Sequence, residues 1–193
     1  MKEMIMSSSE IQDVVSHLGH LLTAELQNEE KRPILLCVMK GAVNFMTDLI
    51  KHVHTPILTD YIQVSSYDGT SSTGTVTLVK KPAYDPEGRT VVIVEDVIDT
   101  GVSMDWLINY LKTQCNPKRV LVCALFNKTA ARKVDVQVDF CGITLPENKF
   151  LVGYGFDYNE LHRNDPFIFI PTEEEIKAWD KIIENDPIKP FKG

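Results

Sequence analysis

The sequence lacks long hydrophobic runs, an excess of positive charge and closely spaced cysteines. No apolar stretch is long enough to cross a bilayer, and the first residues hold no apolar signal core, so we expect a cytoplasmic protein with no membrane partner. The 20 Lys and Arg residues are outnumbered by 27 Asp and Glu residues, for a net charge of −7. This balance argues against a nucleic-acid partner, because such surfaces depend on excess Lys and Arg. Any phosphate group must be held by a local arrangement of donors.

The four cysteines give no sign of a shared site. Cys37, Cys115, Cys123 and Cys141 form no C-x-x-C pair, and at least Cys37 and Cys123 lie inside apolar runs. This spacing favours buried, reduced thiols over a disulfide or a metal site.

The chain does have an alternation of strand-like and helix-like segments. With 193 residues, of which 44% are hydrophobic, it can bury the core of one domain. Apolar or alternating runs predict strands at 34–39, 58–64, 75–79, 91–94, 120–126, 134–138 and 167–170. Apolar residues at helical spacing predict helices over 11–22, 42–50, 102–114 and from 172 onward. Several strands are apolar throughout, which indicates a mainly parallel sheet with both faces covered, whereas 134–138 alternates valine with polar residues, as an edge strand would.

Two pairs of residues predict where helices begin. Ser9 with Gln12 and Thr172 with Glu175 have the spacing of a capping box, in which a hydroxyl and a side chain three residues later satisfy each other's backbone N–H groups. We therefore expect the first helix to begin near Ser9 and the last near Thr172.

The chain is organised around the stretch from Val91 to Ser103. It begins as a β-branched apolar strand, continues with the acids Glu95, Asp96 and Asp99, and runs into the helix predicted over 102–114. Ligands of parallel α/β sheets bind beyond the carboxyl ends of the strands, where a helix N-terminus offers free N–H groups to an anion. The stretch therefore predicts a phosphate site with carboxylates beside it.

This loop resembles the phosphoribosyl pyrophosphate (PRPP) motif of the type I phosphoribosyltransferases, and most of the chain is similar to the hypoxanthine-guanine phosphoribosyltransferases. The resemblance implies an α/β fold with a central, mainly parallel, twisted sheet flanked by helices. It also implies one domain over 1–193, with a small hood from the terminal segments and a flexible active-site loop at about 65–75.

The reaction implied by the resemblance is a step of purine salvage. The 5-phosphoribosyl group of PRPP passes to N9 of hypoxanthine and/or guanine, giving IMP and/or GMP and pyrophosphate, with Mg²⁺ as cofactor. Relatives form dimers or tetramers, so a homodimer or homotetramer is expected. Two alternatives stay open: a noncatalytic PRPP-binding regulator, and a phosphoribosyltransferase that prefers xanthine.

Carried over residue by residue, the family's donor site falls on matching positions. The 5-phosphate would be held by Asp99, Thr100, Gly101, Val102 and Ser103. The ribose would be bound by Glu95 and Asp96, which with Asp157 would also hold Mg²⁺. The pyrophosphate would be bound by Lys40, Gly41 and Arg163.

Two segments of this donor site have special features in the family. Lys40-Gly41 matches a dipeptide at which a strained, often cis, peptide presents N–H groups to pyrophosphate. Ser66-Tyr67 matches the pair on the flexible loop that closes over the site. Arg163 is followed by Asn164-Asp165, where many relatives have Arg-Asp directly.

The base site is likewise carried over from the family. Lys128 would donate to the 6-oxo group, Phe150 would stack on the purine, Leu151 would offer backbone groups, and Asp157 belongs to the same segment. Asp99 would be the general base at N7. Taken singly, these residues have ordinary interpretations: a solvated lysine, a core aromatic, a turn aspartate at Asp157 and a helix N-cap at Asp99.

Overall fold

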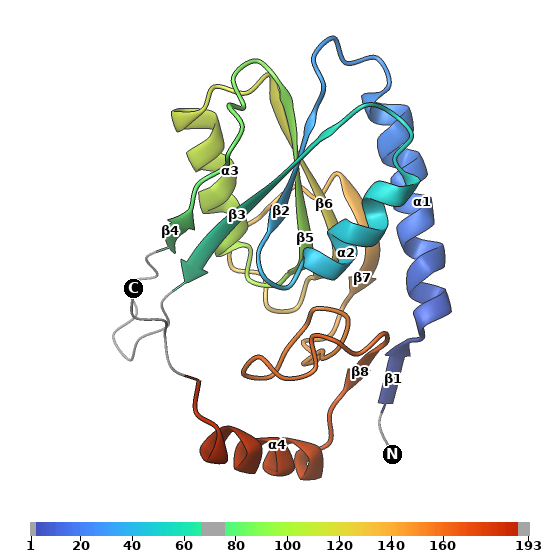
Figure 1. Ribbon diagram of the computed structural model, residues 1–193, viewed down its shortest axis with the longest axis vertical. Coiled ribbons are helices and arrows are strands. Elements are labelled where there is room, and N and C mark those ends of the chain that lie inside the picture. Colours follow the sequence, from blue (N-terminus) through green and yellow to red (C-terminus); the bar gives the residue numbers. More distant parts are fainter. Residues whose placement is uncertain (1–2, 67–75, 189–193) are drawn as a thin grey trace.

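The computed structural model describes residues 3–66 and 76–188, and its centre is a mixed sheet (Figure 1). Within the described residues the sheet has six strands in the order β4-β3-β2-β5-β6-β7, and β4 runs antiparallel to β3 while the other pairs are parallel. The strands are β2 (Ile34–Val38), β3 (Leu58–Ser66), β4 (Val76–Lys80), β5 (Thr90–Ile98), β6 (Arg119–Lys128) and β7 (Phe140–Leu145). The predicted α/β class with a mainly parallel sheet is confirmed.

Helices cover both faces of this sheet. On one face lie α1 (Ser8–Leu26), α2 (Val43–Leu49) and the short 3-10 helix η1 (Ile50–His52), and on the other lies α3 (Val102–Gln114). Successive residues of a strand point to opposite faces, so Leu35 and Val92 pack toward α1 while Leu36 and Ile93 pack toward α3. Burial on both sides explains why these strands are apolar throughout.

Strand β5 lies in the middle of the sheet, as predicted. It pairs with β2 and β6, and Val91 to Val94 are fully buried. The strand is longer than expected, because its pairing with β6 continues through Glu95, Val97 and Ile98. The first two carboxylates of the organising stretch, Glu95 and Asp96, therefore belong to the strand and are held by its backbone.

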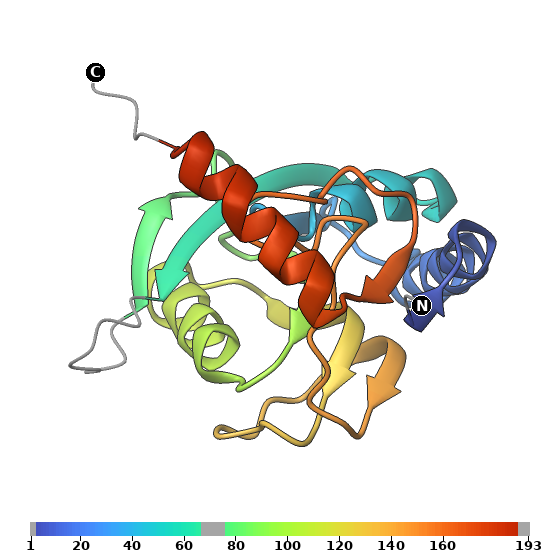
Figure 2. The same cartoon turned by 90° about the horizontal axis from the view of Figure 1, so that it is seen from below.

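The terminal segments form a second layer below the sheet (Figures 1 and 2). Here β1 (Glu3–Met6) pairs antiparallel with β8 (Ile168–Ile170), and α4 (Glu173–Asn185) follows. Val152, Phe169 and Trp179 form the small core of this layer. Strand β8 was predicted, whereas its partner β1 was not; the description of the chain as one domain with a hood stays a prediction.

The strand predicted at 134–138 is wrong. This segment is irregular, and the edge strand is β7, which begins at Phe140. The N–H groups of Lys133 and Val134 donate to the carbonyl of Thr100, at 2.9 and 3.1 Å. The backbone of this segment is therefore used to support the loop before α3, and Val136 is buried beneath it.

One predicted helix start is confirmed and the other is wrong. Thr172 and Glu175 form the capping box of α4, with the Thr172 N–H 2.9 Å from the Glu175 carboxylate. Helix α1 is capped two residues earlier than predicted, because Ser7 and not Ser9 is the N-cap and Glu10 accepts from the Ser7 N–H at 2.8 Å. Helix α1 therefore begins about half a turn before the start that the sequence predicts.

The cysteines are free thiols, as predicted, and Cys37 and Cys123 are buried. Burial, with the nearby Glu95 and Asp96 carboxylates, raises the pKa of Cys37 to about 12. Such thiols stay protonated and unreactive. No helix in 3–66 or 76–188 is long and apolar enough to span a membrane.

Candidate active site

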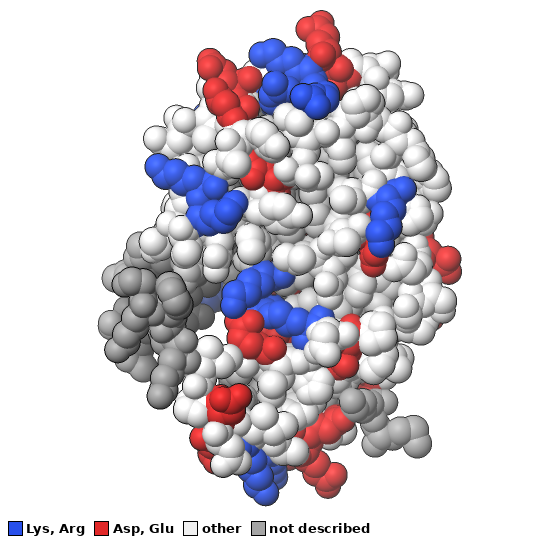
Figure 3. All heavy atoms as spheres, viewed as in Figure 1, with Lys and Arg blue, Asp and Glu red and all other residues white. Residues whose placement is uncertain are grey.

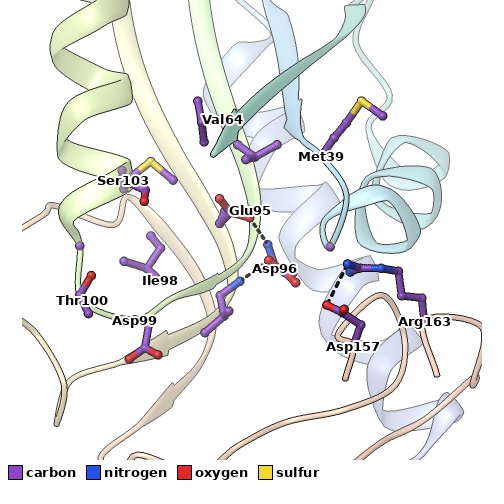
Figure 4. Close-up of a pocket in the computed structure, with 15 residues that line it drawn as sticks. Met39, Val64, Glu95, Asp96, Ile98, Asp99, Thr100, Ser103, Asp157 and Arg163 are labelled. Carbon is purple, nitrogen blue, oxygen red and sulfur yellow. Dashed lines mark hydrogen bonds and ion pairs between the residues drawn. The ribbon is translucent and has the colours of Figure 1, made fainter. Parts of the chain in front are cut away.

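A cleft of about 450 Å³ opens at the carboxyl ends of β2 and β5, and Asp157 and Arg163, from the segment before β8, line its opposite side. Figure 4 shows Thr100 and Ser103 on one side, Asp157 and Arg163 on the other, and Glu95 and Asp96 between them. The predicted site residues that line it are Gly41, Glu95, Asp96, Asp99, Thr100, Gly101, Ser103, Asp157 and Arg163. Residues far apart in the sequence thus meet in one cleft.

The loop between β5 and α3 forms one end of the cleft. Gly101 is the N-cap of α3, with a φ of 82°, and a Cβ there would lie 2.4 Å from the carbonyl oxygen of Val134. Glycine is required because both the conformation and the close approach exclude a side chain. The interpretation of Asp99 as the helix N-cap is therefore wrong. The first turn of α3 leaves N–H groups without partners in the helix, and these suit a phosphate.

The two carboxylates on β5 stand at the floor of the cleft. Asp96 accepts from the Val97 N–H at 2.9 Å, and Glu95 accepts from the Asp96 N–H at 3.2 Å. Burial and the neighbouring Asp96 charge raise the pKa of Glu95, and burial raises the pKa of Asp96. Both acids are therefore placed where a cation or hydroxyl donors would stabilise their charge.

The side of the cleft opposite Thr100 and Ser103 carries paired charges. Arg163 contacts Asp157 at 2.8 Å and Glu160 at 3.0 Å, and donates to the Gly155 carbonyl at 2.7 Å. Lys40 also contacts Glu160, at 3.0 Å. Figure 3 shows basic and acidic side chains gathered across the middle of this face. Hydrogen bonds from Arg163 and Lys40 lower the pKa of Glu160. Glu160 is therefore ionised at neutral pH and pairs with both cations.

The turn after β2 contains a cis peptide bond between Met39 and Lys40. The family resemblance places the strained, often cis, peptide at Lys40-Gly41. In the structure the cis bond lies one residue earlier. Gly41 lies in close contact with the Asp96 carboxylate, because a Cβ on Gly41 would be 2.1 Å from the Asp96 Oδ2 atom.

Of the predicted base-site residues, Asp99 and Asp157 line the cleft, whereas Lys128, Phe150 and Leu151 lie outside its lining. Lys128, the last residue of β6, is only 6% exposed, and its Nζ is 3.8 Å from the Asp99 Oδ2. The interpretation of Lys128 as a solvated lysine is therefore wrong. Phe150 is 49% exposed and packs edge-on against Tyr158, so it is not an ordinary core aromatic. Leu151, by contrast, is buried.

Asp99 lies between Lys128 and the loop before α3. Its Oδ1 is buried and has no hydrogen-bond partner among the described residues. A buried acceptor without a donor costs free energy that a ligand's N–H could recover.

Several predicted residues fall elsewhere. Lys40 and Val102 border the cleft residues in sequence but do not line the cleft themselves. Tyr67 lies outside the described residues, and of Ser66 only the backbone, at the end of β3, is described.

The described residues contain no group of three His, Cys, Asp or Glu side chains that could hold a metal ion by themselves. Mg²⁺ in phosphate-binding sites usually takes only one or two carboxylates, with substrate oxygens and water completing its octahedron. Glu95 and Asp96 fit that requirement, because they are adjacent acids whose charge is costly without a cation.

Sequence reasoning missed two residues of this region, Glu160 and Arg132. Glu160 bridges Lys40 and Arg163, and Arg132 donates to backbone groups at the ends of β5 and β6. Neither belongs to a periodic pattern, so only the folded chain reveals their partners.

Known proteins resemble this chain over most of its length. Residues 7–159 match the family model described as the phosphoribosyl transferase domain. The hypoxanthine-guanine-xanthine phosphoribosyltransferase of Tritrichomonas foetus is 44% identical over 165 residues, covering 84% of this chain and 89% of that protein. The hypoxanthine-guanine phosphoribosyltransferase of Bacillus subtilis is 39% identical over 168 residues, covering 86% and 91%. A solved hypoxanthine phosphoribosyltransferase from Staphylococcus aureus superposes with a TM-score of 0.84 at 34% identity, covering 91% and 94%.

Proposed function

The chain belongs to the phosphoribosyltransferase family, and from this we propose that it is a purine salvage enzyme acting on 6-oxopurines. It transfers the 5-phosphoribosyl group of PRPP to N9 of hypoxanthine or guanine, releasing IMP or GMP and pyrophosphate. The observation that carries the assignment is the meeting of Asp99 and Lys128, 3.8 Å apart, beside the loop that begins α3. An acceptor and a donor at this spacing suit the N7 and O6 atoms of a 6-oxopurine.

The donor substrate is held at both ends of the cleft. The N–H groups at the start of α3, with the hydroxyls of Thr100 and Ser103, bind the 5-phosphate. Glu95 and Asp96 accept from the ribose 2- and 3-hydroxyls. At the other end, Lys40 and Arg163, which both contact the Glu160 carboxylate, bind pyrophosphate. Fixing both ends aims C1 of the ribose at the base.

The base is oriented by the polar groups beside the cleft. Lys128 donates to the 6-oxo group and has no acceptor, so the 6-amino group of adenine would leave it unpaired. Phe150, half exposed at the rim, stacks on the purine ring, and the backbone of Leu151 contacts the base edge. Asp99 accepts the proton at N7 as N9 attacks C1.

Mg²⁺ is the cofactor that this donor set fits, held through Glu95 and Asp96, with Asp157 nearby. When bound, it neutralises charge on the departing pyrophosphate. Asp157 is paired with Arg163 at 2.8 Å, so its contribution is to keep the guanidinium aimed into the cleft or to bind the metal through water.

Further properties follow from the family. We expect a homodimer or homotetramer and reaction in the cytoplasm. The T. foetus relative, named for hypoxanthine, guanine and xanthine, keeps xanthine open as a third base.

The assay that tests this proposal uses PRPP, Mg²⁺ and each of hypoxanthine, guanine, xanthine and adenine, with nucleotide formation followed. We expect turnover with hypoxanthine or guanine and at least about 100-fold lower kcat/KM with adenine. Adenine used as well as hypoxanthine would refute the role of Lys128. Tight PRPP binding without turnover of any base would favour the noncatalytic regulator.

A further inference from the structure

The side chain of Arg132 lies at the junction between the phosphate side and the base side of the site. It is half-buried in the loop after β6, and its guanidinium donates to four oxygens at the carboxyl ends of two strands. The acceptors are the carbonyls of Ile98, Asp99 and Lys128 and the side-chain oxygen of Asn127. No carboxylate pairs with Arg132 among the described residues, so its charge is balanced by backbone and amide dipoles.

These contacts lie where the pairing between β5 and β6 ends. The last partners in that pairing are Ile98 and Asn127. One residue further along each strand, the Nε of Arg132 donates to the Asp99 carbonyl at 3.1 Å, and its Nη2 donates to the Lys128 carbonyl at 3.0 Å. One planar group thus joins the backbones of Asp99 and Lys128 at the point where the two strands would otherwise separate.

The same loop also supports the start of α3. The Cδ of Arg132 would lie 3.1 Å from a Cβ at Gly101, so its stem packs against that glycine. The neighbouring N–H groups of Lys133 and Val134 hold the Thr100 carbonyl. These last bonds come from the backbone, so they remain when the side chain of Arg132 is replaced.

We propose that Arg132 is a positioning residue, which sets the distance between the carboxylate of Asp99 and the ammonium of Lys128 by fixing their backbones. Arginine suits this task because its rigid, planar fork holds the Asp99 carbonyl with Nε and the Lys128 carbonyl with Nη2, whereas lysine presents its donors from a single atom on a flexible stem. The guanidinium of Arg132 acts on the base side, whereas the backbone bonds from Lys133 and Val134 to Thr100 support the phosphate side. This inference rests on the proposed function.

The test compares Arg132→Gln and Arg132→Lys with the wild type and with Arg89→Gln as a matched control. Arg89 also donates to one backbone carbonyl, that of Arg32 at 3.0 Å, but just before the amino end of β5. We expect both Arg132 variants to lose about 100-fold in kcat for hypoxanthine, as misplaced catalytic groups do, with KM for PRPP changed less than about threefold. Arg89→Gln should keep the wild-type kcat.

A large fall in kcat with little change in KM for PRPP distinguishes a positioning role of Arg132 from a general loss of structure. If Arg132→Gln does not fold, Arg132→Lys decides the matter, because it keeps the charge and loses only the fork. Wild-type turnover in Arg132→Lys, or an equal fall of kcat in Arg89→Gln, overturns the inference while the proposed function stands. No nucleotide from the unmodified chain would overturn both.

Discussion

At the scale of single residues, the proposed chemistry depends on Asp99, whose side chain does not cap α3. Its position before a helix suggested an N-cap, but Gly101 takes that place and Asp99 makes no capping bond. One of its oxygens is buried without a donor, and the other faces Lys128. The side chain is therefore available for proton transfer.

The first prediction concerns this carboxylate. Asp99→Asn should lower kcat by about 100-fold or more, the usual contribution of a general base, while KM for PRPP changes little. Asp99→Ala should unfold at nearly the same temperature as Asp99→Asn, because no cap is lost. Steady-state kinetics and calorimetry measure both.

Asp105→Asn is the control for Asp99, since it removes a carboxylate from the first turn of α3 outside the cleft lining. It should keep the wild-type kcat. Equal losses of turnover and PRPP affinity in Asp99→Asn would contradict the assignment of Asp99 as base.

At the scale of elements, the site depends on close approach between the turn after β2 and its neighbours. A Cβ on Gly41 would lie 2.1 Å from the carboxylate of Asp96, and a Cβ on Gly155 would lie 2.1 Å from the carbonyl of Gly41. The first clash involves a movable side chain and the second involves backbone, at a residue whose φ is 107°. The two glycines should therefore respond differently to the same substitution.

We predict that Gly41→Ala keeps the melting temperature within a few degrees but raises KM for PRPP at least about tenfold, because Asp96 must move. Gly155→Ala should destabilise the fold by about 2 kcal/mol or more, through strain and overpacking. An unchanged KM in Gly41→Ala, or wild-type stability in Gly155→Ala, would contradict this reading of the turn.

Elements were predictable where one local rule decided them. The strand at Val91 and the helix from Val102 to Gln114 follow from apolar periodicity, and the start of α4 follows from its capping box. The strand predicted at 134–138 is wrong because this segment supports the loop before α3. Alternation of apolar and polar residues in the sequence cannot reveal such a tertiary contact. Likewise, strand β1 depends on a partner more than 160 residues away.

The candidate site was likewise predictable only in part. Residues in the motif from Glu95 to Ser103 meet because they are neighbours in the chain, and the family resemblance supplied Lys128 and Arg163. Glu160 and Arg132 could not be predicted, because their roles come from contacts between separate segments.

At the scale of the whole molecule, one ionic cluster ties the first helix to the sheet, at the end opposite the cleft. Glu29, just after α1, accepts from Lys118 at 2.8 Å, from Thr90 at 2.8 Å and from Arg119 at 2.7 Å. Burial alone would raise the pKa of Glu29, but these hydrogen bonds outweigh it and lower the pKa to about 2. The cluster therefore contributes to stability only while Glu29 is ionised.

A pH dependence follows from that lowered pKa. In the unfolded chain Glu29 titrates near 4.5, so its contribution is fully present above that pH and is lost as the pH falls toward 2. We predict that Glu29→Gln lowers the free energy of unfolding at pH 7 by up to about 3 kcal/mol, and that the difference shrinks between pH 4.5 and pH 2. Urea unfolding across this range measures it.

Glu30→Gln is the matched control, because Glu30 is the exposed neighbour of Glu29. It should follow the wild type at every pH. A difference between wild type and Glu29→Gln that stays constant from pH 7 to pH 2 would show that the cluster acts through packing and not through charge.

We propose that the cleft transfers phosphoribose and does not merely bind PRPP. The most direct measurement is a single turnover with stoichiometric PRPP, Mg²⁺ and hypoxanthine, with products identified by mass spectrometry. We predict IMP and pyrophosphate in equal amounts from the wild type, and little of either from Asp99→Asn with PRPP still bound. PRPP bound but unconverted by the wild type would contradict it.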